Sequence, residues 1–209
     1  MSVNEYKIVK KAAQGEITEK KSRFIANVIP VTSTEMAEQE IARISKEYWD
    51  ARHNCYAFII GEKSELSRCS DNGEPSGTAG KPILEVIKGS GLTNVLIVVT
   101  RYFGGVLLGT GGLVRAYTQA AQAGLANSEI ATMKKAVPLK LKLGYDMINT
   151  VQYYLRQEEI TVSREEYGAD VEMDIMVEAD LSSKISDDLI QKTNAKIEIT
   201  KGDETYYAF

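Results

Sequence analysis

Hydrophobic and polar positions recur with clear periods in the first part of the chain. The run Val95–Val99 contains no polar residue, which is typical of a strand covered on both faces. Thr32 with Glu35 three residues later forms a capping-box pattern, followed by apolar positions at helical spacing. This part is therefore predicted to be a mixed α/β unit, with strands over 16–30, 55–60 and 95–100, helices over 33–49 and 112–125, and a short helix from Ile83 that stops near Gly89.

A second series of elements begins near Ala136. The pattern predicts a strand over 139–143, a helix over 147–155 and a strand that begins at 160–162. A strand over 171–177, a helix over 181–189 and a strand over 197–199 follow. Tyr167–Asp170 predicts a hairpin turn, and Ser182 predicts the cap of the last helix. The order βαββαβ is typical of a ferredoxin-like fold. We therefore predict an α+β protein with two domains, 1–135 and 136–209.

The aromatic residues near position 209 admit two interpretations. Tyr206, Tyr207 and Phe209 are predicted to lie on a strand that docks on the second sheet. The alternative is that they form a surface that binds a partner.

The charge of the chain is unevenly distributed. The net charge is −4, but the residues up to Lys135 hold 17 Lys and Arg against 14 Asp and Glu, while the remainder holds 8 against 15. Only the first part can therefore offer a basic surface, and its densest basic run is Lys7–Arg23. Such a run is either a solvated strand or a patch that binds nucleic acid.

Several classes of protein are disfavoured by the composition. The longest aliphatic run is Val95–Val99, far short of the roughly 20 residues of a membrane span, and the first 16 residues are polar, so we expect neither a membrane segment nor secretion. The two cysteines, Cys55 and Cys69, are expected to be reduced, small buried hydrophobes in the cytoplasm. Because His53 is the only histidine, we expect no zinc or other metal, and we expect no cofactor.

The segment Arg101–Tyr117 holds five glycines within positions 104–112, between a predicted strand and a predicted helix. This segment does not match the dinucleotide fingerprint. The loop over 71–82 does not match the P-loop either, because Pro75 replaces its first glycine and Pro82 replaces its Ser or Thr. Backbone N–H groups at the start of the helix can still hold an anion. The alternative is that the glycines only allow a turn. The candidate binding residues are Lys81, Arg101, Gly104, Gly105, Gly109, Gly111 and Arg115.

A second candidate site is an acid–base cluster of His53, Asp71 and Glu74. The sequence does not require these side chains to meet. Asp71 with Asn72 and Gly73 is also explained as a tight turn.

The chain resembles the YigZ/IMPACT family. The resemblance rests on ARHNCYAF (51–58), DNGEPSGTAGKP (71–82) and VLIVVTRYFGGVLLGTGGLVRAY (95–117). The family signature of an arginine, two aromatics, paired glycines and a leucine–glycine pair matches Arg101, Tyr102, Phe103, Gly104, Gly105, Leu108 and Gly109. Asn72 stands where the family often has a second aspartate, which puts any role for paired carboxylates there in doubt.

The resemblance implies an N-terminal ribosomal-protein-like (domain 2-type) α/β fold, followed by a ferredoxin-like domain similar to the last domain of elongation factor G. It also implies that eukaryotic relatives regulate translation by binding a partner protein. We therefore expect a cytoplasmic, non-catalytic binding protein associated with translation, whose partner is RNA, the ribosome or a translation factor. The alternative is an enzyme that acts on a small phosphorylated or peptide-like substrate through His53, Asp71 and Glu74.

Overall fold

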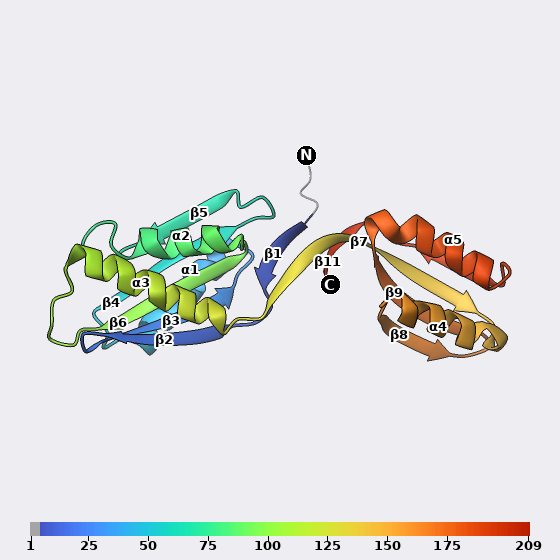
Figure 1. Ribbon diagram of the computed structural model, residues 1–209, viewed down its shortest axis with the longest axis horizontal. Coiled ribbons are helices and arrows are strands. Elements are labelled where there is room, and N and C mark those ends of the chain that lie inside the picture. Colours follow the sequence, from blue (N-terminus) through green and yellow to red (C-terminus); the bar gives the residue numbers. More distant parts are fainter. Residues whose placement is uncertain (1–4) are drawn as a thin grey trace. The chain divides into compact units, whose positions relative to one another are not determined.

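The computed structural model describes residues 5–209 and has a two-domain α+β fold with two sheets. One compact unit ends at Thr132 and the other spans Met133–Phe209 (Figure 1). The boundary predicted from the sequence lies between residues 135 and 136. Residues 1–4, which begin the predicted first domain and its polar N-terminal stretch, lie outside the described range.

A five-stranded antiparallel sheet forms the centre of the N-terminal unit. Its strand order is β2-β3-β6-β4-β5. The strands are β2 (Ala13–Glu19), β3 (Ser22–Pro30), β6 (Val95–Tyr102), β4 (His53–Ile60) and β5 (Leu66–Ser70). A short strand, β1 (Glu5–Val9), forms an isolated parallel bridge from Lys7 to Leu92.

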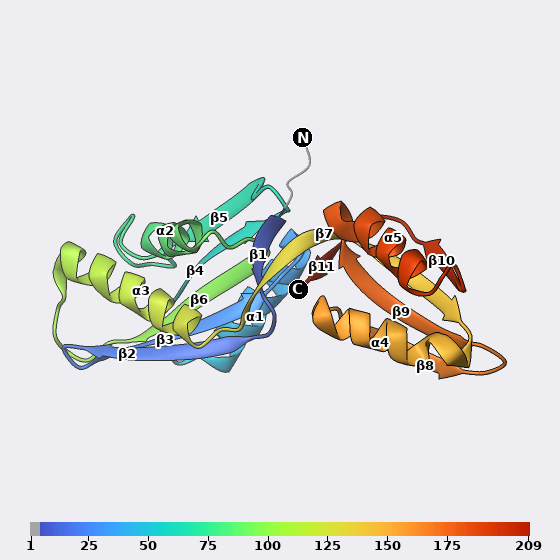
Figure 2. The same ribbon diagram turned by 45° about the vertical axis from the view of Figure 1, so that its right-hand side comes forward.

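Helices cover both faces of this sheet. Residues Val95, Ile97 and Val99 of β6 pack in one hydrophobic cluster with α2 (Gly80–Ser90) and α3 (Gly109–Ala126). Leu96 and Val98 pack in a second cluster with α1 (Thr34–Glu47). The predicted coverage of this strand on both faces is therefore confirmed, and α2 and α3 lie side by side over one face (Figures 1 and 2).

Three local predictions were wrong. The segment 16–30 is a hairpin instead of one strand, because Lys20 and Lys21 adopt positive φ values of 44° and 68° and reverse the chain. The cap of α1 is Ser33, whose Oγ accepts the Met36 N–H, and not Thr32. Ser182 does not cap α5, because its hydroxyl donates to the Ala179 carbonyl.

The C-terminal unit has the predicted order βαββαβ. Its elements are β7 (Ile130–Leu143), α4 (Ile148–Gln157), β8 (Val162–Tyr167), β9 (Val171–Glu178), α5 (Ser182–Lys192) and β10 (Ile197–Lys201), with 3₁₀ turns at Tyr145–Met147 and Ala179–Leu181. The strand order β10-β7-β9-β8 is that of a ferredoxin-like sheet. The strand β11 (Thr205–Ala208) pairs with β7, which confirms the predicted strand for Tyr206 and Tyr207, whereas Phe209 lies just beyond it.

Among residues 5–209, no helix has both the length and the apolar character needed to cross a membrane.

We predict that Gly15→Ala destabilises the N-terminal unit, because α3 crosses β2 at this glycine. A Cβ at position 15 would lie 2.4 Å from the backbone of Ala123 and Gly124, so the helix must move away. Such overpacking costs roughly 1–3 kcal/mol of unfolding free energy, measured by urea denaturation.

The matched control is Gly89→Ala in α2, where an added Cβ meets nothing within 4 Å. This variant should be unchanged, or more stable by about 0.5–1 kcal/mol, because alanine favours a helix over glycine. Equal stability of the two variants would contradict the close packing of β2 and α3.

Candidate functional site

A buried ion pair joins the loop over 71–80 to the end of β6. The Arg101 Nη1 lies 2.6 Å from the Glu74 Oε1, and the two side chains are only 7% and 4% exposed. The Tyr117 hydroxyl of α3 donates to the same carboxylate oxygen at 2.8 Å. One carboxylate therefore connects the 71–80 loop, a central strand and the helix that follows the glycine-rich segment.

The aromatic rings of Phe24 and Phe103 lie against the guanidinium group of Arg101. The Arg101 Cζ is 5.4 Å from the centre of the Phe24 ring and 5.6 Å from that of Phe103. The Nε of Arg101 is buried and has no hydrogen-bond partner among the described residues. A guanidinium can interact favourably with an aromatic face, so these rings partly compensate for the loss of water around it.

The thiol of Cys55 extends this buried cluster. Its Sγ lies 3.3 Å from the Tyr117 hydroxyl and 2.9 Å from the Asp71 carbonyl oxygen, so one S–H has two possible acceptors. Burial raises the pKa of the Cys55 thiol to about 12, and burial likewise raises the pKa of Tyr117. Both groups are neutral at physiological pH, and Cys55 is the buried thiol that was predicted. Cys69 is exposed on β5, so its predicted burial was wrong.

The side chain of Asp71 holds the loop in shape. Its carboxylate accepts hydrogen bonds from the backbone N–H groups of Gly77, Ala79 and Gly80 at 2.8–2.9 Å. Burial by itself would raise the pKa of Asp71, but the three N–H groups together lower it below its ordinary value. Asp71 therefore serves as the anionic cap of the backbone where α2 begins.

The proposed acid–base cluster shows no mutual hydrogen bonds among the described residues. The His53 Nδ1 lies 2.8 Å from the Asn72 carbonyl oxygen, while Asp71 and Glu74 are each bonded to other groups. Asn72 also accepts the Asn54 N–H through its Oδ1 at 2.8 Å, and it has a positive φ of 43°. The predicted turn at 71–73 is confirmed. Catalysis by the three residues stays a prediction. The carboxylates of Asp71 and Glu74 are both already bonded to other groups.

The glycines between β6 and α3 have distinct structural reasons. Gly104 packs on the β2–β3 turn so closely that a Cβ would lie 2.0 Å from the Lys21 carbonyl carbon. Gly105 and Gly109 have positive φ values of 81° and 69°, which favour glycine. Gly111 lies in the exposed first turn of α3, near the Arg115 guanidinium. The glycines therefore form the predicted turn, and anion binding at this helix start stays a prediction.

The candidate cations differ in their exposure. Lys81 and Arg115 are exposed and form no ion pair among the described residues, whereas Arg101 is 6% exposed and paired with Glu74. An anion can reach Lys81 or Arg115 directly. Arg101 instead supports the 71–80 loop from the interior of the protein, through Glu74.

Sequence reasoning missed an exposed surface formed by the 103–107 loop and the β2–β3 turn. Phe103, Val106 and Leu107 are 50%, 41% and 83% exposed. Gly104 packs this loop against the backbone of Lys21, and the Gly104 N–H donates to the Ser22 hydroxyl at 3.2 Å. The loop between β6 and α3 lies beside the β2–β3 turn (Figures 1 and 2). The hydrophobic residues were visible in the sequence, but their neighbour, the Lys20–Lys21 turn, is about 80 residues away along the chain. We call Lys20, Lys21, Phe103, Val106 and Leu107 the loop surface.

Within residues 5–209, no three His, Cys, Asp or Glu side chains gather as a metal site would require.

Comparison with known proteins places the chain in a family. Residues 20–125 match the Impact N-terminal domain, and residues 141–196 match a domain of unknown function, DUF1949. The chain is 37% identical over 204 residues to the IMPACT family member YvyE of Bacillus subtilis (strain 168), covering 98% of this chain and 94% of that protein. The chain therefore belongs to the IMPACT family.

Two further relatives show how far the similarity extends. Protein IMPACT of Mus musculus is 36% identical over 98 residues, which are 44% of this chain and 30% of that protein. A solved structure described as a hypothetical protein has 30% identity and a TM-score of 0.62, with 96% of this chain and 98% of that chain covered. The similarity to the bacterial relative and to the solved structure therefore covers both units of this chain.

We predict that Glu74→Gln destabilises the protein strongly. The substitution leaves the buried Arg101 guanidinium without its counter-charge, which costs about 3–5 kcal/mol of unfolding free energy in comparable buried pairs. Urea denaturation measures the loss, and the double variant Arg101→Met/Glu74→Leu should recover part of it, because no unpaired charge remains.

The matched control is Glu16→Gln, which breaks the ion pair of Glu16 with Arg23 at the exposed surface. This pair is solvated, so the control should change stability little. If Glu74→Gln is no more harmful than Glu16→Gln, the ion pair does not have the structural role described above.

Proposed function

We propose that this protein is a cytoplasmic, non-catalytic binding protein of the translation machinery, and that its N-terminal unit contacts RNA on the ribosome. The observation that carries this proposal is the loop surface, where an exposed aromatic ring lies on a loop packed against the β2–β3 turn, which holds the exposed Lys20 and Lys21. Proteins that bind single-stranded RNA combine the same two elements, because bases stack on aromatic rings and lysines attract phosphates.

The ring of Phe103 is held in place for such contact. Half of its surface is exposed, and the guanidinium of Arg101 lies 5.6 Å from its centre on the protein side. Because the Arg101–Glu74 pair fixes this guanidinium, the ring has a firm support. A preformed aromatic platform loses little conformational entropy when a base stacks on it.

Four exposed basic side chains of the N-terminal unit form no ion pair among residues 5–209. These are the side chains of Lys20, Lys21, Lys81 and Arg115. The N-terminal part also carries the excess of basic residues, while the chain from Ala136 onward is acidic. A polyanionic partner would therefore be attracted to the N-terminal unit and repelled by the other.

The carboxylates of the motif loops support a non-catalytic role. Asp71 is bonded to three backbone N–H groups, and Glu74 is bonded to Arg101 and Tyr117. General acid–base catalysis needs a carboxyl that can reach the substrate's proton. The bonds of these two groups instead favour loops that are built to keep one shape.

The test is co-sedimentation with ribosomes purified from Bacillus subtilis across a salt series. We expect Lys20→Gln/Lys21→Gln to weaken binding and to reduce the slope of log K against log salt by about 1–2, because two phosphate contacts are lost. Phe103→Ala should weaken binding by about tenfold or more at every salt concentration, because stacking contributes roughly 1–3 kcal/mol per base.

The matched control is Lys46→Gln/Lys63→Gln, which removes the same charge from α1 and from the turn between β4 and β5. It should leave the slope nearly unchanged. Absence of association at low salt would overturn the proposed function. Association that survives nuclease digestion and Phe103→Ala would assign the contact to a protein partner instead of RNA.

A further inference from the structure

A pocket of about 510 Å³ lies in the C-terminal unit, and its lining comes from that unit alone. It is lined by the segment that follows α4, by β8, by the end of β9, by the start of α5, and by β11 with the residue after it. Buried or half-buried Ile160, Val177 and Ile185 contribute apolar surface to it. The pocket therefore has room and an apolar lining for part of a ligand.

Two aromatic rings stand at this pocket in an exposed position. Tyr207 lies in β11, and Phe209 follows the last residue of that strand. Their ring centres are 5.2 Å apart at an interplanar angle of 73°. Both residues line the pocket, and their side chains are 41% and 49% exposed. Aromatic faces in such a position attract a cationic side chain.

Three glutamates, Glu158, Glu159 and Glu178, line the same pocket. Glu178 is paired with Lys134 at 2.7 Å, so its charge is compensated. Glu158 reaches Lys184 only at 4.0 Å, and Glu159 forms no ion pair among the described residues. These two residues also follow the C-terminal end of α4, where unpaired carbonyl groups add partial negative charge. The lining thus combines two aromatic rings with three carboxylates, of which only that of Glu159 has no ion-pair partner among the described residues.

We propose that this pocket binds a basic peptide segment, with an arginine or lysine side chain against Tyr207 and Phe209 and its charge facing Glu158 and Glu159. Charge complementarity selects this occupant, because the same glutamates repel phosphates and acidic peptides. The apolar lining accommodates a hydrophobic neighbour of the cation in the bound segment. This site is separate from the loop surface and does not depend on RNA binding there.

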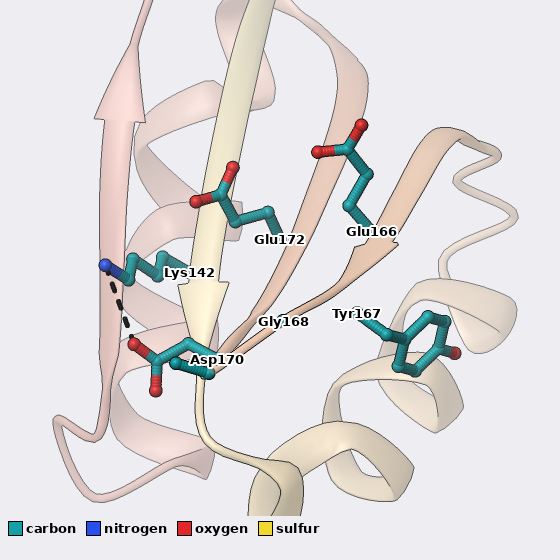
Figure 3. Close-up of a pocket in the computed structure, with 7 residues that line it drawn as sticks. Lys142, Glu166, Tyr167, Gly168, Asp170 and Glu172 are labelled. Atoms are coloured by element: carbon teal, nitrogen blue, oxygen red, sulfur yellow. Dashed lines mark ion pairs between the residues drawn. The ribbon is translucent and has the colours of Figure 1, made fainter.

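A second cavity in the same unit provides a contrast. It has a volume of about 350 Å³ at the β8–β9 hairpin and is also acidic, with Glu166 and Glu172 pointing the same way (Figure 3). Its Asp170 is paired with Lys142 at 3.5 Å and its Glu166 with Arg164 at 2.5 Å. Besides the ring of Tyr167, its lining includes no apolar side chain larger than alanine. It has three carboxylates, as the first pocket does, but no large aliphatic side chain, so it serves as the matched control.

The experiment measures fluorescence anisotropy of a short fluorescein-labelled peptide of alternating arginine and leucine with the full chain. The wild type should bind this peptide and should bind the alternating glutamate–leucine peptide far more weakly. Glu158→Gln/Glu159→Gln should weaken binding of the basic peptide by about tenfold. Glu166→Gln/Glu172→Gln, the same change of charge at the hairpin cavity, should change binding by less than about twofold.

A further pair of variants tests the aromatic contact. Phe209→Ala should weaken binding of the basic peptide by about fivefold, while Tyr153→Ala, which removes an exposed ring from α4, should leave it unchanged. The proposal is overturned if the wild type does not bind the basic peptide or binds the acidic peptide equally well. It is also overturned if both glutamate pairs weaken binding equally, because the attraction would then come from the general charge of the unit.

Discussion

The ion pair between Arg101 and Glu74 is the contact on which the N-terminal candidate surface depends. It lies where β6 ends, beneath two motif loops that are separated by more than 20 residues, and it also binds the Tyr117 hydroxyl of the next helix. A buried charge is tolerated only when it is paired. The pair therefore constrains both loops at once, and the support of Phe103 by the Arg101 guanidinium follows from the same constraint.

The same constraint explains why signature residues with charged side chains need not touch a ligand. Asp71 and Glu74 look like acid–base groups in the sequence, yet their hydrogen bonds hold the backbone of the loop and the guanidinium beneath it. The surface that remains exposed includes Phe103, Val106 and Leu107, with Lys20 and Lys21 on the adjacent turn. Loops held from inside in this way present a fixed surface, which suits recognition of a partner.

Periodic patterns predicted most of the fold. The uninterrupted run of β6 and the alternation along β9 each identified a strand, and the order βαββαβ identified the ferredoxin-like unit. The β2–β3 turn was missed because it contains two lysines at positive φ instead of glycine or asparagine. The burial of Arg101 was missed because its partner comes from a distant loop, and the pairing of β3 with β6 brings the lysine turn to the glycine loop only in three dimensions.

The two units present opposite chemistry to a partner. The N-terminal unit has an exposed aromatic ring on a loop packed against a turn with two lysines that are unpaired among the described residues, which fits RNA. The C-terminal unit instead has a pocket lined by aromatic rings and glutamates, which fits a basic peptide. Ribosomes contain both of these partners, RNA and basic peptide segments. The most direct test of the account is hydrogen–deuterium exchange of the chain, free and bound to ribosomes. The account predicts slower exchange at 18–22 and 103–111 on binding and no change in β5, whereas unchanged exchange in both of the first two segments would contradict it.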